Sequence, residues 1–372
     1  MSKIRVMLVV GARPQFIKSA PLIREIITRH KRIELSIVHS GQHYDPQMSE
    51  IFFRELKMPR PFANLRAGSG THATQTATIM KRLEKLIVRD SPDVVVVPGD
   101  TNTTLAGALA AAKLSVPVAH VEAGLRSGDM TMPEEINRRL TDHCSALRFA
   151  PTRTAILNLK KESLDKATYL TGDTMVDALH TVIPIVQERQ GEILAAHGLQ
   201  PHHYTLVTLH RPSNVDILSG LARIQLALRK VAQTLKVVFP IHPRTHARLA
   251  RLKALSGLRR SGVVMMQPQG YVEILSLLKN AACLLTDSGG MQKESFLLHV
   301  PCITLRSTTE WPETLSRKAN QLINDPRLIP KTILATASNA QLRNDIRSLG
   351  NPFGDGHASS SIARLIEQKT PR

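Results

Sequence analysis

Hydrophobic residues in this chain gather in short continuous runs bounded by glycine, proline, aspartate or other polar residues. Continuous apolar runs, rather than alternating ones, predict strands that are buried on both faces, as in parallel sheets. In the first half these runs cover 4–10, 34–39, 93–98, 117–121, 146–150 and 167–170. In the second half they cover 204–209, 236–241, 262–267, 281–286, 301–305 and 320–324.

Most of the runs are separated by enough chain for a helix, and strands that alternate with helices indicate the α/β class. The pattern occurs twice, with a turn and a long predicted helix at 171–201 between the two halves. We therefore expect two Rossmann-like domains, 1–172 and 173–356. Ligands of such sheets bind beyond the carboxyl ends of the strands. The active site is then expected in the interdomain cleft, among residues that directly follow the runs.

Length and composition agree with this organisation. A chain of 372 residues exceeds what one core usually serves, and with 3% aromatics the cores must be aliphatic. Cys144, Cys283 and Cys302 form no CxxC pair, so we expect buried, reduced thiols in a cytoplasmic protein. The first run has no cleavage site after it, and no run approaches the ~20 residues of a membrane span. We expect neither a signal peptide nor membrane insertion.

The formal net charge of +19 permits nucleic acid, anionic membrane surfaces or phosphorylated metabolites as partners. However, the basic residues are spread along the chain without a basic arm or a patch interleaved with aromatic residues. A solvated surface is the simpler interpretation, and no specific nucleic-acid partner is predicted. Attraction of phosphate then has to come from local motifs.

Acidic residues cluster after two neighbouring runs and at the next predicted helix. Asp100 follows the run 93–98, Glu122 follows 117–121, and Glu134 and Glu135 open a helix. Each alone has an ordinary explanation as a helix cap or as a favourable charge at a helix N-terminus. Together they suggest acids directed into one cleft. Crowded carboxylates raise some pKa values, which suits proton transfer.

Two strand ends offer places for an anion. The turn after the first run contains Gly11, Arg13 and Lys18, and a glycine at a helix N-terminus lets an anion approach the backbone. The turn matches neither GxGxxG nor a P-loop, which disfavours dinucleotides and magnesium nucleotides. His210 ends the run 204–209 and is a candidate acid, base or phosphate partner, or simply a capping or solvated histidine.

A second anion seat follows the run 281–286. Ser288, Gly289 and Gly290 would offer a hydroxyl and backbone N–H groups at a helix N-terminus. Glu294, one turn later, could accept both ribose hydroxyls of a nucleotide or merely favour the helix dipole. No spacing of histidine, cysteine and acids typical of a metal site recurs, and no metal or cofactor is predicted.

Taken in order, these motifs resemble the non-hydrolysing UDP-N-acetylglucosamine 2-epimerases over nearly the whole chain. The segments that carry the resemblance are GARPQFIKSAP, SGQHYDPQMSEIFF, PGDTNTTLAGALAA, HVEAGLRSGDMTMPEEINRRLTDH, TGDTMVDAL, TLHRPSNVD, LTDSGGMQKES, TTEWPET and GNPFGDGHAS. The resemblance implies a GT-B-like fold, a homodimer, and interconversion of UDP-GlcNAc and UDP-ManNAc without a redox cofactor. The implied route is anti elimination of UDP to a 2-acetamidoglucal, followed by re-addition.

The resemblance also assigns residues. It implies acid and base roles for Asp100, Glu122 and Glu134, and a place near the diphosphate, with a catalytic contribution, for His210. It implies substrate contacts for Arg13, Lys18, Ser288, Gly289, Gly290 and Glu294. A second, regulatory UDP-GlcNAc site would use Gln42, Glu135, Arg211 and His242, although Tyr44-Asp45 and Thr71-His72 depart from that site. A closing helix at 357–369 is expected to pack back onto the first domain.

One departure widens the choice of substrate. Many relatives carry Thr-Glu-Arg-Pro-Glu where this chain has tryptophan, Trp311, in the third position. That tryptophan and the Gly-Ala-Arg-Pro-Gln opening also resemble a branch that acts on UDP-2,3-diacetamido-2,3-dideoxy-glucuronic acid. A GT-B glycosyltransferase is a more remote alternative, because a transferase has little need of three acids in its first domain.

Overall fold

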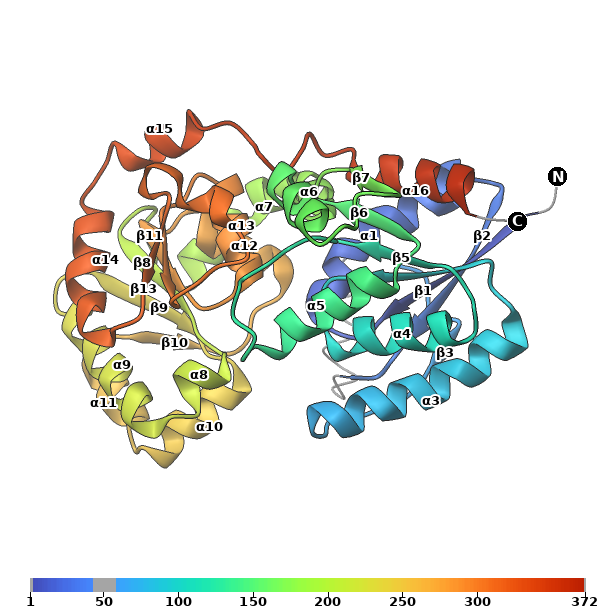
Figure 1. Ribbon diagram of the computed structural model, residues 1–372. Coiled ribbons are helices and arrows are strands. Elements are labelled where there is room, and N and C mark those ends of the chain that lie inside the picture. The colour runs from blue at the N-terminus through green and yellow to red at the C-terminus, as the bar shows by residue number, and fades with distance from the viewer. Residues whose placement is uncertain (1–2, 43–57, 371–372) are drawn as a thin grey trace. The chain divides into compact units, whose positions relative to one another are not determined.

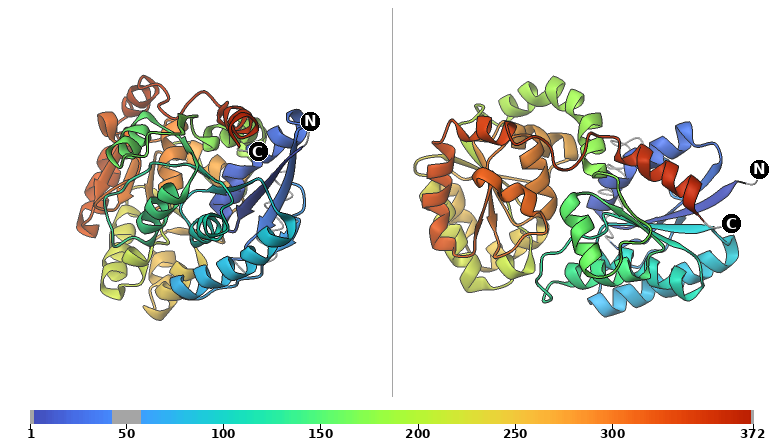
Figure 2. Two further views of the ribbon diagram at one scale, coloured as in Figure 1. Left: turned by 45° about the vertical axis from the view of Figure 1, so that its right-hand side comes forward. Right: turned by 45° about the horizontal axis from the view of Figure 1, so that its top comes forward.

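A computed structural model describes residues 3–42 and 58–370, so Tyr44 and Asp45 lie outside the described part. The chain forms two compact units, Met1–Thr181 with Pro352–Arg372 and Val182–Asn351. Each unit is a parallel sheet with helices packed on it (Figure 1; Figure 2). We expected the join at residue 172; the two compact units divide after Thr181, within the long helix α7 (Thr174–Ala196).

The first unit contains a sheet with the order β3-β2-β1-β4-β5-β6-β7, in which every printed pairing is parallel. Its strands are β1 (Ile4–Val10), β2 (Ile33–His39), β3 (Ala63–Asn64), β4 (Val94–Pro98), β5 (Val118–Val121), β6 (Leu147–Ala150) and β7 (Thr168–Leu170). All six runs predicted for this half are strands. The short edge strand β3 was not predicted, because two residues leave no hydrophobic pattern to recognise.

Helices cover both faces of this sheet, which explains the continuous hydrophobic runs. They are α1 (Arg13–Arg29), α3 (His72–Asp90), α4 (Asn102–Lys113), α5 (Pro133–Cys144), α6 (Arg153–Lys161), the start of α7, and α16 (Ala358–Lys369). Met7 and Val9 of β1 join a core cluster with α3 and α4. Val6 and Leu8 point to the other face and are equally buried. In Figure 1, α3, α4 and α5 lie side by side, and α1 packs beside α16.

The C-terminal segment returns to the first unit through two of the motifs noted in the sequence. The carboxylate of Asp177 accepts hydrogen bonds from the backbone N–H groups of Ala358 and Ser359, at 3.3 and 2.8 Å, and so caps α16. Gly172 and Gly354 both have positive φ and meet backbone to backbone, so that a Cβ on either would lie within about 3 Å of the other segment. The glycines of TGDT and NPFGDG therefore allow this close approach.

The second unit has a sheet with the order β10-β9-β8-β11-β12-β13, again parallel. Its strands are β8 (Tyr204–Thr208), β9 (Lys236–Pro240), β10 (Val264–Met266), β11 (Cys283–Thr286), β12 (Cys302–Leu305) and β13 (Asn320–Ile323). Its α-helices are α8 (Pro212–Val215), α9 (Leu218–Val231), α10 (Pro243–Arg251), α11 (Leu255–Arg260), α12 (Tyr271–Lys279), α13 (Gly289–Leu297), α14 (Ile329–Ala337) and α15 (Leu342–Arg347). Two 3₁₀ helices, η1 (Pro312–Lys318) and η2 (Pro326–Leu328), complete it.

Both sheets reverse their strand order at one place, between β1 and β4 in the first unit and between β8 and β11 in the second. Loops on either side of such a reversal leave in opposite directions and open a crevice at the carboxyl ends of the strands. Residues that follow β1, β4, β8 and β11 are therefore where a ligand of each unit is expected.

Of the three cysteines expected to be buried, Cys283 and Cys302 are buried and Cys144 is half-buried. Cys144, Cys283 and Cys302 are free thiols, and burial raises the pKa of Cys283 to about 11 and that of Cys302 to about 12. Among the helices of the described part, none is long and apolar enough to cross a membrane.

Candidate functional site

The turn after β1 is tied to the end of β4 by a buried glutamine. The side-chain carbonyl of Gln15 accepts from the N–H groups of Gly11 and Ala12, at 2.8 and 3.0 Å. Its amide donates to the carbonyl of Pro98, at 2.9 Å. A Cβ on Gly11 would lie 1.9 Å from the hydroxyl oxygen of Ser40, so this position needs glycine. These contacts fix the turn after β1 relative to the end of β4, the two strands between which the strand order reverses.

Lys18 of α1 and Glu122 at the end of β5 form a close ion pair, with 2.5 Å between Nζ and Oε2. The two side chains are only 13% and 3% exposed. Glu122 also has a φ of +73°, a left-handed conformation that costs a residue with a side chain about 1–2 kcal/mol. Such strain persists where surrounding contacts hold it, which is characteristic of functional positions. The side chain of Arg13 lies outside the described part of the structure.

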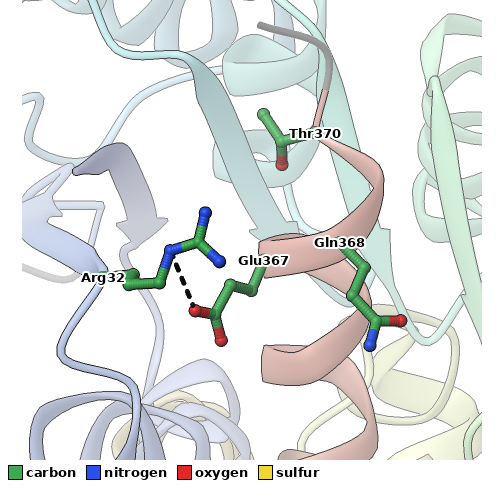
Figure 3. A pocket seen from close by; sticks show the side chains of 4 residues that line it. All are labelled: Arg32, Glu367, Gln368 and Thr370. Carbon is green, nitrogen blue, oxygen red and sulfur yellow. Dashed lines mark ion pairs between the residues drawn. The ribbon is translucent and has the colours of Figure 1, made fainter. Parts of the chain in front are cut away.

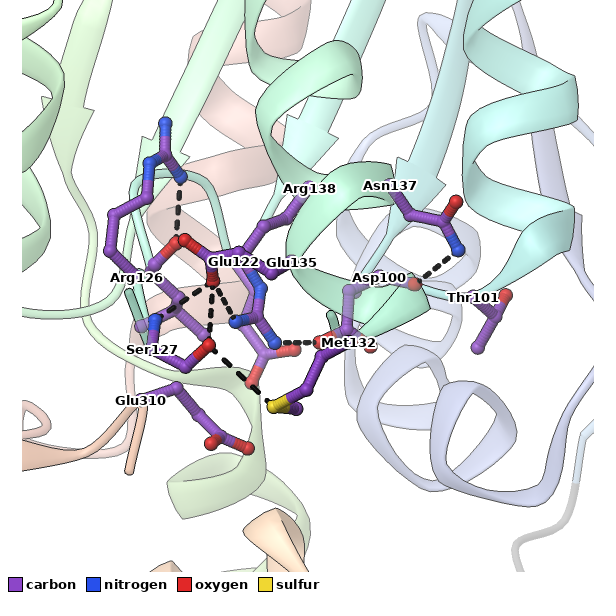
Figure 4. Close-up of polar contacts among 12 residues, drawn as sticks. Asp100, Thr101, Glu122, Arg126, Ser127, Met132, Glu135, Asn137, Arg138 and Glu310 are labelled. Atoms are coloured by element: carbon purple, nitrogen blue, oxygen red, sulfur yellow. Dashed lines mark hydrogen bonds and ion pairs between the residues drawn. The ribbon is translucent and has the colours of Figure 1, made fainter. Parts of the chain in front are cut away.

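Asp100, after β4, has a different cation. Its carboxylate pairs with Arg138 of α5, and its backbone carbonyl accepts from the amide of Asn137 at 2.9 Å. Arg138 is 1% exposed and also pairs with Glu135 at 2.7 Å, so it joins the two acids (Figure 4). We missed Arg138 in the sequence, although its position three residues after Glu135 on a predicted helix was a usable signal.

Glu134 and Glu135 both lie in the first turn of α5, but their surroundings differ. Glu134 is half-buried, and no hydrogen bond or ion pair joins it to the described residues. Glu135 is completely buried; its carboxylate accepts from the N–H and hydroxyl of Ser127, at 2.8 and 3.0 Å, and pairs with Arg138 and Arg139. These bonds anchor the segment between Glu122 and α5 (Figure 4).

The expectation that crowding raises the pKa of a carboxyl group is wrong for Glu135. Burial alone would raise its pKa, but the hydrogen bonds from Ser127 and the charges of Arg138 and Arg139 outweigh burial and lower it. Asp100 and Glu122 likewise each have a basic partner. Within the described residues, three of the four acids are therefore paired with cations and Glu134 is not, a distinction that spacing in the sequence does not reveal.

Gln42, proposed for a second site, lies in the first unit, where its side-chain oxygen accepts from the hydroxyl of Thr103 at 2.7 Å. His242 is exposed at the N-terminus of α10, 5.6 Å from His210 between ring centroids. Gln42 and Glu135 belong to the first unit, and Arg211 and His242 belong to the second.

In the second unit, Asp287 organises the residues after β8. Its fully buried carboxylate accepts from the backbone N–H groups of His210 and Arg211, at 3.1 and 3.0 Å, and from the amide of Asn214 at 3.1 Å. The imidazole Nδ1 of His210 lies 3.3 Å from the same carboxylate, while 43% of its side chain is exposed. The backbone N–H and the ring Nδ1 of His210 thus face Asp287, while the rest of the ring is partly exposed to solvent. The motif LTDSGGMQKES contains Asp287, but this role of the residue was not predicted from the sequence.

Ser288, Gly289 and Gly290 begin α13 as predicted, and the Ser288 hydroxyl accepts from the N–H of Met291 at 3.5 Å. Glu310 lies against this turn, because a Cβ on Gly289 would come within 2.1 Å of its Oε1. Glu310 is held by Arg306 at 2.7 Å. Glu294 is 4% exposed on the same helix.

Trp311 is 2% exposed and packs on a lysine. The ammonium of Lys293 lies 3.9 Å from the centroid of the indole ring, within the range of a cation–π interaction. The indole Nε1 would be 3.6 Å from a Cβ on Gly289. A positive charge is therefore present one helical turn behind the anion seat.

A hollow of about 570 Å³ on the first unit does not include the candidate acids Asp100, Glu122, Glu134 and Glu135 (Figure 3). It is lined by Arg32, Glu367, Gln368 and Thr370. Arg32 precedes β2, so this hollow lies at the amino ends of the strands, away from the acids. Within the described residues, no group of three or more histidine, cysteine or acidic side chains could hold a metal ion.

Comparison with known proteins agrees with this geometry. A family model described as UDP-N-acetylglucosamine 2-epimerase matches residues 25–367. A protein of Methanocaldococcus jannaschii named UDP-N-acetylglucosamine 2-epimerase is 43% identical, over 96% of this chain and 98% of that protein. A Pseudomonas aeruginosa protein named UDP-2,3-diacetamido-2,3-dideoxy-D-glucuronate 2-epimerase is 42% identical, over 97% of this chain and 99% of that protein.

A solved structure is similar throughout its length. The crystal structure of the Methanocaldococcus jannaschii UDP-GlcNAc 2-epimerase, in complex with UDP-GlcNAc and UDP, superposes with a TM-score of 0.90 and 42% identity. The match covers 98% of this chain and 100% of that chain. The predicted fold class, two Rossmann-like domains with parallel sheets, is confirmed.

Proposed function

The chain belongs to the UDP-N-acetylglucosamine 2-epimerase family, and we propose that it interconverts UDP-GlcNAc and UDP-ManNAc. The observation that carries the proposal is the pair of acids at neighbouring strand ends of the first unit. The carboxylate of Asp100 pairs with Arg138, and that of Glu122 pairs with Lys18. Inversion at C2 needs one group that removes a proton and another that returns one.

The proposed reaction is an elimination followed by an addition. A carboxylate takes the proton from C2, the C1–C2 double bond forms, and the bond from C1 to the UDP oxygen breaks. UDP then adds back to C1 of the 2-acetamidoglucal while a carboxylic acid protonates C2 from the opposite face. We propose Asp100, Glu122 and Glu134 for these proton transfers, and His210 to stabilise the charge that develops on the leaving diphosphate.

We assign the nucleotide to the second unit. Ser288, Gly289 and Gly290 at the N-terminus of α13 would hold the diphosphate, because backbone N–H groups at a helix N-terminus attract anions. The buried charge of Lys293 behind that turn favours the same anion. Glu294 would accept the ribose hydroxyls. Arg13 and Lys18 would contact the sugar or the diphosphate from the first unit.

A second candidate is epimerisation of UDP-2,3-diacetamido-2,3-dideoxy-glucuronic acid. The relative with that name is as similar as the one named for UDP-GlcNAc, at 42% against 43% identity. The net charge of +19 also suits a substrate with one more carboxylate. Turnover of both purified substrates under the same conditions distinguishes the two candidates by the ratio of kcat/KM.

The proposal includes a cytoplasmic homodimer and a second, regulatory UDP-GlcNAc site at Gln42, Glu135, Arg211 and His242. For Glu135 this requires a rearrangement, because both its carboxylate oxygens are already bonded to neighbouring residues. Light scattering of the purified protein tests the dimer. The initial rate as a function of UDP-GlcNAc concentration tests the regulatory site, because activation by substrate gives a sigmoidal curve.

The acid roles are tested with Asp100→Asn, Glu122→Gln and Glu134→Gln. We expect each variant to fold and bind UDP but to lose about 10²- to 10⁴-fold in kcat, the usual contribution of general acid–base catalysis. Asp93→Asn is the matched control, because Asp93 precedes the opposite end of β4, where it pairs with Arg5. Near-normal turnover in all three variants would contradict the proposal.

A further inference from the structure

His120 of β5 is completely buried, and both nitrogens of its ring face oxygen acceptors. Nδ1 lies 2.7 Å from Oδ1 of Asp142, and Nε2 lies 2.8 Å from the backbone carbonyl of Gly99. A carbonyl oxygen can only accept, so Nε2 must carry a hydrogen. The protonation of Nδ1 then depends on the state of Asp142.

Asp142 has every reason to be ionised. Its other oxygen accepts from the backbone N–H of Gly124 at 3.1 Å and from Arg126 at 2.7 Å. Burial would raise its pKa, but the charges and hydrogen bonds of His120 and Arg126 outweigh burial and lower it. The ring of His120 therefore links the carbonyl of Gly99 to the carboxylate of Asp142.

The His120–Asp142 pair binds the backbone beside two proposed catalytic acids. Gly99 immediately precedes Asp100, and Gly124 follows Glu122 by two residues. Gly99 and Gly124 have positive φ, which glycine adopts readily, whereas the positive φ of Glu122 puts the second turn in a conformation that a residue with a side chain does not favour. Such conformations persist only where neighbouring contacts hold them.

We infer that His120 is a positioning residue that, with Asp142, fixes the strand-end turns carrying Asp100 and Glu122 relative to each other. The ring of His120 joins Gly99 of the first turn to Asp142 of α5, and the carboxylate of Asp142 joins α5 to Gly124 of the second turn. This role rests on the proposed function. Proton transfer on opposite faces of a sugar ring tolerates little error in the relative placement of the two acids.

Two substitutions separate the two bonds of the ring. In His120→Gln the amide nitrogen reaches about as far as Nε2 and can still donate to the carbonyl of Gly99. In His120→Asn the amide stops at about the distance of Nδ1, so the bond to Gly99 is lost. We expect His120→Asn to lose about 100-fold in kcat, as a misplacement of about 1 Å can. His120→Gln should recover a large part of that loss.

KM for UDP-GlcNAc and affinity for UDP should change little in both variants, because the nucleotide is assigned to the second unit. His30→Gln is the matched control. His30 also binds a carboxylate through Nδ1, that of Glu367 at 2.8 Å, but it lies just before the amino end of β2, not at the carboxyl ends of the strands. A loss of kcat that follows only the loss of thermal stability, equal in His30→Gln and His120→Asn, would overturn the inference. Wild-type kcat in His120→Asn would overturn it as well.

A readout without turnover keeps this inference separate from the proposed function. In ¹⁵N-histidine-labelled protein near neutral pH, the signals lost in His120→Gln should include a protonated Nε2 that exchanges slowly with water. An Nε2 without a hydrogen would overturn the inference whatever the enzyme does. Absence of epimerisation by the wild-type protein would instead reject the proposed function, and the ¹⁵N experiment would still decide the state of His120.

Discussion

At the scale of single residues, the first unit pairs two of the acids that we propose for proton transfer with cations. Glu122 has Lys18, Asp100 has Arg138, and the fully buried Glu135 shares Arg138 with Asp100. In a low-dielectric interior, an ionised group is tolerable only when it is paired and hydrogen-bonded. The pairing thus places a cation beside each of these three carboxylates.

Lys18→Met should destabilise the fold, because it leaves the nearly buried carboxylate of Glu122 without its cation. We expect the free energy of unfolding to fall by about 3 kcal/mol, the usual result of removing one partner of a buried pair. Adding Glu122→Gln to this variant should restore most of the stability but none of the activity. Urea unfolding of the two variants measures this. A double variant as unstable as Lys18→Met would contradict the ion-pair explanation.

Acid should destabilise the protein through Glu162, whose pKa is lowered by its hydrogen bond with Arg126. A carboxyl group with a lowered pKa stabilises the folded state above its unfolded pKa, near 4.5, and this contribution is lost as the pH falls through the folded pKa. In Glu162→Gln, stability near pH 7 should be lower and its decline in acid shallower. Urea unfolding between about pH 7 and pH 3 measures both.

The comparison for the acid experiment is Glu188→Gln, an exposed glutamate of α7 that makes no ion pair with the described residues. Its unfolding curves should follow those of the wild-type protein at every pH. Parallel pH dependences for wild type and Glu162→Gln would show that the pair with Arg126 does not contribute to acid stability.

At the scale of elements, the start of α13, where we propose that the nucleotide binds, depends on how closely a loop approaches that helix. Glu310 lies against the first residue of α13, in contact with Gly289, and Arg306 fixes its carboxylate. The same loop carries Trp311, whose ring covers Lys293 of α13. Loop and helix start are thus one packed element, in which the two neighbouring glycines have unequal roles.

Gly289→Ala should therefore cost more than Gly290→Ala. A Cβ at 289 would lie 2.1 Å from Glu310, whereas one at 290 would meet only the Ser288 hydroxyl at 3.9 Å. We expect Gly289→Ala to lower the free energy of unfolding by about 1–3 kcal/mol, as overpacking does. Gly290→Ala should be neutral or stabilise by up to about 1 kcal/mol. Thermal unfolding compares them, and equal effects would contradict this packing.

Elements were also the part of the structure most accessible from the sequence. All twelve predicted strands are present, because strands of parallel sheets are buried on both faces and leave continuous hydrophobic runs. Strand ends also directed attention to Asp100, Glu122, His210 and Ser288. What the sequence could not show was the partner of each group. The contacts of Arg138 with Asp100, of His120 with Gly99 and Asp142, and of Asp287 with His210 join residues 21 to 77 positions apart. Such contacts follow from the fold rather than from local spacing.

At the scale of the whole molecule, the chain repeats one solution twice. The sheet of the second unit has the strand order 3-2-1-4-5-6, and that of the first unit has the same order followed by a seventh strand. In both units, polar groups follow the strands that flank the reversal. The first unit supplies acids with cations, and the second supplies an anion seat and a histidine held by Asp287. This division of groups, with the family to which the chain belongs, supports a reaction in which UDP leaves and returns.

The most direct test of that reaction is proton NMR of UDP-GlcNAc incubated with the protein in D₂O. We predict that deuterium replaces the C2 proton while signals of UDP-ManNAc grow, because the C2 proton is removed and a solvent-derived one returned. A folded protein that binds UDP but gives neither exchange at C2 nor UDP-ManNAc would contradict the account.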